Sequence, residues 1–236
     1  MFTTVGDVNT VVYIFASDYS LLMPKNTSAL SNPLPRGPHA LSREEVAQSQ
    51  RERLLAAMIE CVAECGYAQT SVADVLARSG VSRATFYQQF VDKEDCFRAA
   101  YEQAAARLSS ALLTSLSTDA LSEEPLRRLG RMLEVYLGTL AQQPAVARTF
   151  LVEIHAAGPA MNEQRQAAID AFIDLVAGIL QGQLAHLGTV ADQRFAVKLQ
   201  VHGLMSLVTG MVGANETARL TELQQPLLRL AGKLLE

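Results

Sequence analysis

Hydrophobic residues recur at intervals of three and four through most of the chain, and this spacing predicts a succession of amphipathic helices. The first covers Ser42 to Cys65 and ends at Gly66, a residue type favoured just after a helix. A shorter helix begins at Thr70-Ser71 and ends at Gly80, which accepts the left-handed backbone conformation that closes a helix. The two apolar stripes consist of Val46, Leu55, Met58, Ile59 and Val62, and of Val72, Val75 and Leu76.

A third helix follows after a very short turn, so the two short helices form the pattern of a helix-turn-helix, a DNA-binding motif. Ser82 is placed to cap this helix, and Phe86 and Phe90 are spaced to face inward. Asp92 is then expected to cap a long helix from Lys93 to about Leu113. The helix after Ser82 also carries side chains of the kinds that contact base edges and phosphates: Arg83, Thr85, Gln88 and Gln89.

The second half of the chain carries five further apolar stripes, and each predicts a helix. The first ends before Pro144, the second ends before Gly158-Pro159, and the fourth is broken by Gly203 and Gly210. Small residues on the third and fourth would let helices from two subunits approach closely. In chain order the stripes are Leu126, Leu129, Leu133, Tyr136, Leu137 and Leu140; Val146, Phe150 and Ile154; Ile169, Phe172, Ile173, Val176, Ile179, Leu180 and Leu184; Phe195, Leu199, Met205, Val208 and Val212; and a final helix from Leu220 to Leu235.

The first forty residues have a different composition. They hold half of the 8 prolines of the chain, and such a stretch cannot form a helix or a central strand. We therefore expect residues 1–41 to be a flexible extension, or one whose beginning is translated only in silico, with the true start at Met23. A basic arm that enters the minor groove is a weaker alternative, because few cations are available there.

The net charge argues against a protein that coats nucleic acid without regard to sequence. The chain has a formal net charge of −4, and the segment from Ser42 to Tyr101 holds seven basic and nine acidic residues. A broad cationic patch binds any DNA with a steep dependence on salt, whereas a few cations, hydroxyls and helix dipoles bind random DNA weakly. The hypothesis is therefore a sequence-specific DNA-binding protein with little affinity for scrambled duplex.

The run GYAQTSVADVLARSGVSRATFYQQFVDKEDCF, from Gly66 to Phe97, resembles the N-terminal domain of the TetR family of transcriptional regulators. The match is dense between Val46 and Tyr101, and it departs from the family at Gln89, where many members carry His or Tyr. The resemblance implies an all-α fold with two domains. These would be an N-terminal helix-turn-helix DNA-binding domain at residues 42–108 and a C-terminal helical ligand-binding and dimerisation domain at residues 109–236.

The resemblance also implies roles for individual residues in binding double-stranded operator DNA. Side chains at the start of the first motif helix would touch phosphate, those of the second would face the operator, and one lysine would meet the DNA backbone. Independently, a hydroxyl or a helix-start N–H can bind phosphate, and an arginine can bond the major-groove edge of guanine with two hydrogen bonds. The three groups are Thr70 and Ser71; Ser82, Arg83, Thr85 and Tyr87; and Lys93.

A homodimer is expected for a functional reason. One helix-turn-helix contacts too few base pairs to select a single site, whereas a two-fold dimer reads two half-sites about one helical turn (~34 Å) or a multiple apart. The operator should then be palindromic. The resemblance favours a repressor released by a small-molecule effector, and a DNA-binding protein that is ligand-independent or controlled by a partner is the alternative.

Several residues of the second half favour a small hydrophobic ligand. Apolar and aromatic residues with a few polar handles lie on helices that could enclose a cavity, although core packing explains each of them equally well. His202 is a further residue that could orient a polar group or sit hydrogen-bonded in the interior. The candidate ligand-binding residues are Met132, Tyr136, Phe150, Ile154, His155, Phe172 and Met205.

Other functions find little support in the sequence. None of the common nucleophile, metalloprotease, phosphate-loop or dinucleotide motifs occurs, so we expect no enzyme, and no cofactor is indicated. Cys61, Cys65 and Cys96 lack zinc-type spacing, so no metal site is expected and buried packing is favoured over a thiol sensor. The apolar run Val11 to Ala16 is too short to span a bilayer, and we expect a cytoplasmic protein without a membrane partner.

Overall fold

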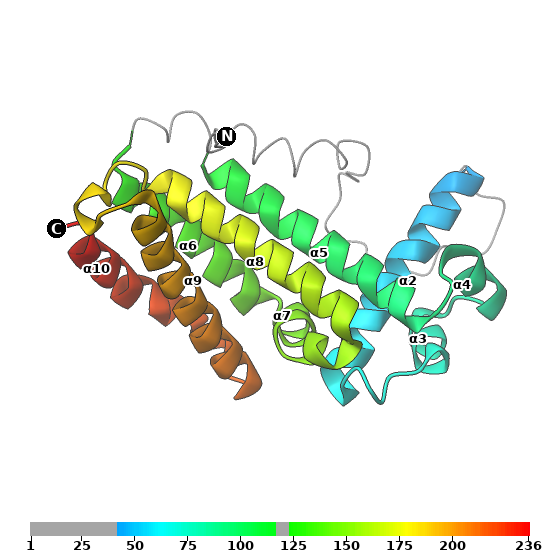
Figure 1. The fold of residues 1–236 in the computed structure, drawn as a ribbon. Helices are drawn as coiled ribbons and strands as arrows, with labels where there is room; N and C mark the ends of the chain where they lie inside the picture. The colour runs from blue at the N-terminus through cyan, green and yellow to red at the C-terminus, as the bar shows by residue number, and fades with distance from the viewer. Residues whose placement is uncertain (1–41, 117–122) are drawn as a thin grey trace.

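The computed structural model describes residues 42–116 and 123–236, and these residues form an all-helical fold (Figure 1). The expectations for residues 1–41 lie outside the described part of the chain. The α-helices are α2 (Arg43–Cys65), α3 (Val72–Ser79), α4 (Arg83–Gln89), α5 (Lys93–Ser115), α6 (Pro125–Gln142), α7 (Pro144–Leu151), α8 (Pro159–Ile179), α9 (Val190–Gly213) and α10 (Gln224–Leu234). Short 3-10 helices are η2 (Glu153–Ala157), η3 (Ala185–Leu187) and η4 (Thr217–Leu223).

Polar residues fix the starts of α2, α3, α4 and α5. The Ser42 and Ser71 hydroxyls accept hydrogen bonds from backbone N–H groups of the first turn, and an acidic residue three positions on bonds back in each case. Ser82 and Asp92 cap α4 and α5 in the same way, without the reciprocal bond. These caps satisfy backbone donors that the helix leaves unpaired, so each start lies where the sequence predicts it.

Two hydrophobic clusters hold the described residues together. One fills the space between α2, α3, α4 and α5, and its largest fully buried side chains include Phe86, Phe97 and Met58. This first cluster also takes in Phe150 of α7, Ile154 of η2 and Met161 of α8. Helices α2 and α5, which flank the predicted helix-turn-helix, are therefore packed directly on the second half of the chain.

The second cluster lies among α6, α8, α9, η4 and α10. Met132, Leu137 and Val208 are completely buried in it. In Figure 1 the helices α2, α3 and α4 lie at one end of an elongated molecule, and α10 lies with the C-terminus toward the other. Helix α5 leads from the first group toward the second.

Three helices of the second half differ from the prediction. Helix α7 ends at Leu151 and the chain tightens into η2, so the predicted stripe through Ile154 is not one helix. Helix α9 runs unbroken through Gly203 and Gly210, because contacts with α7, α8 and η4 hold it. The predicted final helix from Leu220 to Leu235 is a 3-10 segment followed by α10.

The α9 stripe was also predicted on the wrong face at its start. Met205, Val208 and Val212 are buried as expected, but Phe195 and Leu199 are 67% and 65% exposed. The predicted set mixed two faces of one helix, because hydrophobic residues lie on both. An apolar stripe of α9 therefore faces outward in the single chain.

Candidate nucleic-acid interface

The turn between α3 and α4 is built on one glycine and one arginine. Gly80 ends α3 in the left-handed conformation, with φ of 64°, and Arg53 of α2 donates from Nε to the Ser79 carbonyl at 3.0 Å. A Cβ at Gly80 would lie 3.1 Å from the Arg53 guanidinium. This arginine fixes the short turn against α2, and the sequence pattern gave no sign of the long-range contact.

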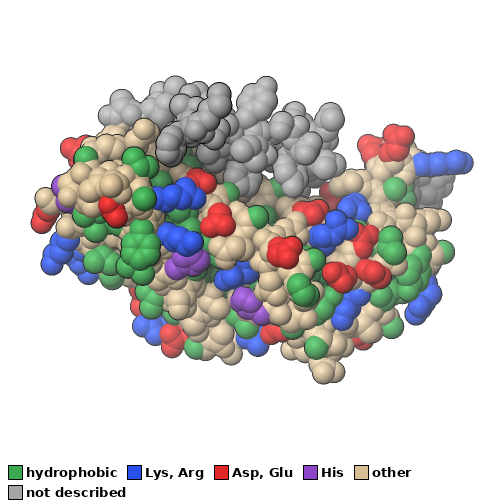
Figure 2. Space-filling model, in the orientation of Figure 1, with side chains coloured by type: hydrophobic (Ala, Val, Ile, Leu, Met, Phe, Trp, Pro, Cys, Tyr) green, Lys and Arg blue, Asp and Glu red, His purple; other side chains and the backbone are tan. Residues whose placement is uncertain are grey.

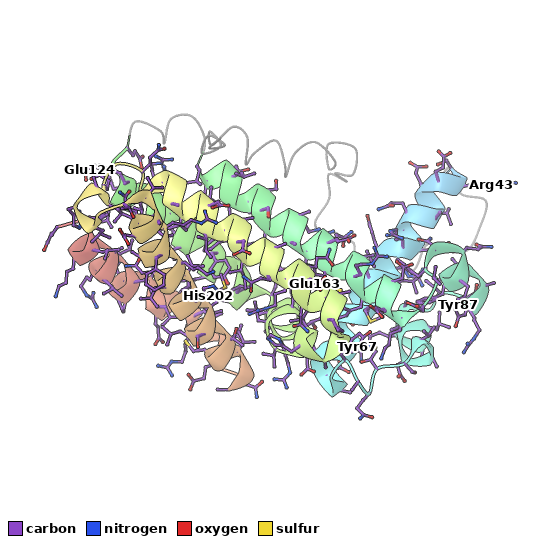
Figure 3. The ribbon with its side chains drawn as sticks, in the orientation of Figure 1. Arg43, Tyr67, Tyr87, Glu124, Glu163 and His202 are labelled. Atoms are coloured by element: carbon purple, nitrogen blue, oxygen red, sulfur yellow. The ribbon has the colours of Figure 1, made fainter. Side chains whose placement is uncertain are left out.

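The outer surface of α4 carries the predicted operator-facing side chains. Ser82, Arg83 and Tyr87 are exposed and Thr85 is half-buried, with the Ser82 and Thr85 hydroxyls 2.9 Å apart. Tyr87 is 51% exposed, although its ring contacts Phe86 edge-on at 5.3 Å. In Figure 3 Tyr87 lies at the end of the molecule formed by α2, α3 and α4. A polar, partly aromatic surface is thus presented by a short helix whose other face is core.

Helix α4 is held to α2 by two further contacts. The Gln89 side-chain amide donates to the Ala47 carbonyl at 2.9 Å. The Arg51 guanidinium lies 4.6 Å from the centroid of the Phe90 ring, within the range of a cation–π interaction. Gln89, the position that departs from the family pattern, therefore packs α4 against α2.

The remaining predicted phosphate contacts do not share one environment. Ser71 is exposed at the start of α3, but its hydroxyl is engaged with Asp74. Thr70 is only 3% exposed and donates to the Gly66 carbonyl at 2.9 Å. The Thr70 hydroxyl is thus turned inward, where it completes the turn after α2, and a contact of this side chain with phosphate stays a prediction.

Lys93 is likewise tied to this turn. Its ammonium group donates to the carbonyls of Tyr67 and Thr70, each at 3.0 Å, and lies 4.1 Å from the Tyr67 ring centroid. Lys93 is half-buried. These contacts position the turn that precedes α3 and leave the ammonium only partly available to a phosphate.

The seven candidate ligand-binding residues do not gather around one cavity. Phe150 and Ile154 belong to the first cluster, where Phe150 contacts the rings of Phe97 and Tyr101 at 5.6 and 5.5 Å. His155 is exposed, and its ring nitrogen lies 3.1 Å from the Asn162 side-chain oxygen. The other members, Met132, Tyr136, Phe172 and Met205, belong to or pack on the second cluster.

Three of the latter residues touch. The Tyr136 hydroxyl donates to the sulfur of Met205 at 3.2 Å, and its ring lies 5.5 Å from that of Phe172. Burial raises the pKa of Tyr136 above its ordinary value, and the positive charge of Arg165 opposes part of that rise. The phenol is thus a neutral donor, bonded to the weak acceptor of a thioether.

Two surface hollows lie elsewhere. One, of about 360 Å³, is lined by Cys61, Glu64, Cys65, Asp74, Ala77 and Arg78 on α2 and α3. The other, of about 400 Å³, lies where α6 meets α10, beside Arg127, Arg131 and Leu228. Neither hollow is lined by a predicted ligand residue. Within residues 42–116 and 123–236, no three His, Cys, Asp or Glu side chains are grouped to hold a metal ion.

Charges of both signs are mixed over the surface. Figure 2 shows Lys and Arg side chains interspersed with Asp and Glu along the whole visible face. Several are paired, as in Arg78 with Glu60 and Glu64, and Arg194 with Asp174. This view shows no continuous basic band, which agrees with the balance of charges in the sequence.

Comparisons with known proteins agree with this geometry. The family model described as "Bacterial regulatory proteins, tetR family" matches residues 54–100. The fatty acid metabolism regulator protein of Bacillus subtilis (strain 168) is 21% identical over 180 residues, covering 75% of this chain and 91% of that protein.

Two solved structures share the fold. The transcriptional regulator FadR of Bacillus subtilis, in complex with stearoyl-CoA, matches with a TM-score of 0.64 and 19% identity, over 78% of this chain and 97% of that one. A TetR-like regulator from Rhodococcus sp. RHA1 matches with a TM-score of 0.62 and 21% identity, over 81% and 99%.

Proposed function

Because this chain belongs to the TetR family of bacterial regulatory proteins, we propose that it is a repressor released from a palindromic operator by a small hydrophobic ligand. The observation that carries the proposal is the exposed polar face of α4. Phe86 and Phe90, on the opposite side, are buried and pack this helix on the first cluster. Arg83 would bond the edge of a guanine, and Ser82, Thr85 and Tyr87 would contact phosphates and bases. We call α3, the turn and α4 (residues 72–89) the reading head.

Dimerisation would take place through α8 and α9. Helix α9 is long and apolar enough to cross a bilayer, with a mean hydropathy of 1.3 over its best window. However, one face of it lies in the second cluster, through residues such as Val201 and Val208. The outward stripe, which includes Phe195 and Leu199, therefore suits a second copy of the chain, whose own stripe would cover it.

The ligand class is proposed from chemistry and likeness together. The candidates in or against the second cluster, Met132, Tyr136, Phe172 and Met205, are apolar or aromatic, which suits a fatty chain. The Bacillus subtilis regulator of similar fold holds stearoyl-CoA, so a long-chain acyl-CoA is the first compound to test. To release the protein from DNA, the ligand must bind more tightly to the conformation that fits DNA poorly than to the conformation that fits it well. A preference of about 10⁴, or about 5.5 kcal/mol, switches the population almost fully from one conformation to the other.

The test is fluorescence anisotropy against the intergenic DNA that flanks the coding region, with a scrambled duplex and a salt series. We expect binding confined to the native sequence, and release on addition of stearoyl-CoA. Arg83→Ala should weaken binding by about 1–3 kcal/mol and relax specificity at one base pair of each half-site. Arg127→Ala, an exposed arginine of α6, is the matched control and should bind as the wild type does.

Two results would count against the proposal. Equal binding to native and scrambled duplex would refute a sequence-specific reading head. Unchanged operator affinity under saturating stearoyl-CoA would exclude this acyl-CoA as the effector.

The packing of the second cluster favours a second candidate function, in which no ligand is bound, because Met132 and Tyr136 are both buried there. A ligand-independent or partner-controlled DNA-binding protein would show operator binding and no thermal stabilisation by any small molecule of a screen.

A further inference from the structure

A pair of charged residues connects the second half of the chain to the reading head. Arg148 of α7 and Glu153 of η2 form an ion pair, with an Arg148 nitrogen 3.7 Å from a Glu153 oxygen. Both side chains are mostly sheltered, at 34% and 18% exposure. An ion pair in such a place is less screened than one on the open surface, so the attraction between its two charges is stronger.

Glu153 reaches across to the turn after α2. Its other carboxylate oxygen accepts a hydrogen bond from the backbone N–H of Tyr67 at 3.3 Å. The same oxygen lies 3.0 Å from where a Cβ of Gly66 would be, and Gly66 has a φ of 83°. Only glycine allows both that backbone conformation and the close approach of the carboxylate. The turn and Glu153 therefore fit one another.

This turn is the immediate support of the reading head. Thr70 ends it, and Ser71 caps α3 directly afterwards. Its carbonyls are held by Lys93 at the start of α5, and the Tyr67 ring contacts Phe97 at 4.8 Å. A displacement of Glu153 would consequently act through this turn on the first residues of α3.

The other end of the pair reaches α9. An Arg148 nitrogen donates to the Asn215 side-chain oxygen at 3.4 Å. Asn215 lies just beyond the end of α9 and has a positive φ of 61°, so the backbone turns sharply there. Helix α9 also carries the exposed apolar stripe that is proposed to contact the second copy of the chain. The contacts thus run from the end of α9, through Arg148 and Glu153, to the turn before α3.

Neighbouring contacts make this connection stiff. The Thr149 hydroxyl, fully buried, donates to the Ile59 carbonyl of α2 at 3.0 Å. Phe150, next along α7, packs on Phe97 and Tyr101 of α5. These contacts dock α7 on α2 and α5. The charged pair instead connects α7 and η2 to the turn before α3 and to the end of α9.

We propose that Arg148 and Glu153 are positioning residues, which fix the reading head relative to α9 and thereby set the separation of the two heads in the dimer. The inference rests on the proposed function, because a separation exists only in a dimer that binds two half-sites. Neither side chain needs to touch DNA. The two residues set which half-site spacing the dimer prefers, and each reading head binds its own half-site without them.

The experiment measures how operator affinity depends on half-site spacing. Full-length protein is titrated against palindromes whose central spacer is lengthened or shortened one base pair at a time. We expect the wild type to prefer one spacing by about tenfold or more, because a rigid dimer must present its heads at one separation. Glu153→Ala and Arg148→Ala should each flatten this preference to within about threefold across neighbouring spacings, since the heads are then free to adjust.

Controls separate positioning from a general loss of structure. Arg148→Ala leaves the carboxylate that accepts from Tyr67 in place, so it serves even if Glu153→Ala fails to fold. Glu153→Gln keeps an acceptor oxygen and should restore part of the spacing preference. Glu134→Ala removes an exposed carboxylate of α6 and should keep the wild-type profile. Thermal denaturation and binding to a single half-site are measured for each variant.

The outcomes are distinct. A spacing profile unchanged in both alanine variants would overturn the inference while leaving the proposed function intact. Equal losses at every spacing, matched by the loss on a single half-site, would also overturn it and would mean that the pair merely stabilises the fold. A wild type that binds no palindrome at any spacing would refute the proposed function itself.

Discussion

The ammonium group of Lys93 donates to the Tyr67 carbonyl at 3.0 Å and lies 4.1 Å from the centroid of the same residue's ring. One side chain thus holds both the backbone and the aromatic ring of the turn between α2 and α3. A hydrogen bond from a charged donor contributes more than a neutral one, and a cation–π contact adds to it. Lys93 is therefore the main polar tie between the start of α5 and this turn.

Lys93→Ala should lower the free energy of unfolding by about 2 kcal/mol, because two carbonyls lose a charged donor and the ring loses its cation. Urea denaturation followed by circular dichroism measures this loss. Arg98→Ala, which breaks only an exposed pair with Asp95, should change the midpoint little. Equal midpoints for Lys93→Ala and the wild type would show that the turn holds without this tie.

Replacing the outward residues of α9 should dissociate the proposed dimer. Phe195→Glu combined with Leu199→Glu would place carboxylates in an apolar interface, which we expect to weaken self-association by about 100-fold or more. Light scattering coupled to size-exclusion chromatography gives the mass at several concentrations.

Val91→Glu is the matched control for that experiment. Val91 is an apolar residue with 80% exposure, and it lies between α4 and α5, away from α9. This variant should keep the mass of the wild type. A double variant of α9 that stays dimeric at the lowest concentration would place the interface elsewhere.

Acid should weaken two helix starts. Hydrogen bonds from Ser71 and Thr189 lower the pKa of Asp74 and of Asp192, respectively, below their ordinary value. A carboxyl whose pKa is lower in the folded state stabilises the fold above its unfolded pKa, near 4, and loses that effect as the pH falls through its folded pKa.

The combined variant Asp74→Asn and Asp192→Asn should therefore melt below the wild type at pH 7. As the pH falls through the folded pKa values of the two carboxyls, the two melting temperatures should converge, because the wild-type carboxyls are then protonated. Thermal denaturation across a pH series checks this expectation. A difference that stays constant down to the lowest pH would mean that the capping carboxylates contribute nothing through their charge.

The three cysteines should differ in reactivity. Burial raises the pKa of the Cys96 thiol to about 12 and also raises the pKa of Cys61, whereas Cys65 is exposed. Because the thiolate is the reactive form, a thiol reagent at pH 8 should label one cysteine rapidly in the folded protein and three in denaturant. Rapid labelling that persists in Cys65→Ser would show that a buried thiol becomes accessible through opening of the fold.

The starts of α3, α4 and α5 were predictable because a cap is a local signal. Ser71, Ser82 and Asp92 each bond to backbone within their own first turn, so neighbouring residues alone identify them. The bend at the end of α7 was not predictable. Ile154 continues the helical spacing, but its place is set by packing in the first cluster, far from it in sequence.

The site shows the same division. Arg83 and Tyr87 follow from a short motif, and the structure places both on the surface of α4. The role of Glu153 was not predictable, because its partner is the backbone N–H of Tyr67, 86 positions away, and a backbone N–H has no sequence signature. The ligand residues failed to converge because hydrophobicity marks a core residue and a cavity-lining residue alike.

The first hydrophobic cluster also bears on how such regulators can be recombined. Phe97 and Tyr101 of α5 pack on Phe150 of α7, and Thr149 donates a hydrogen bond to α2, so the helices that support the motif share their interior with the rest of the chain. A chimera joined within α5 would expose aromatic rings or force foreign ones together. Transplanting new sequence specificity into this scaffold therefore requires exchanging the matching surface of α7 and η2 along with the motif.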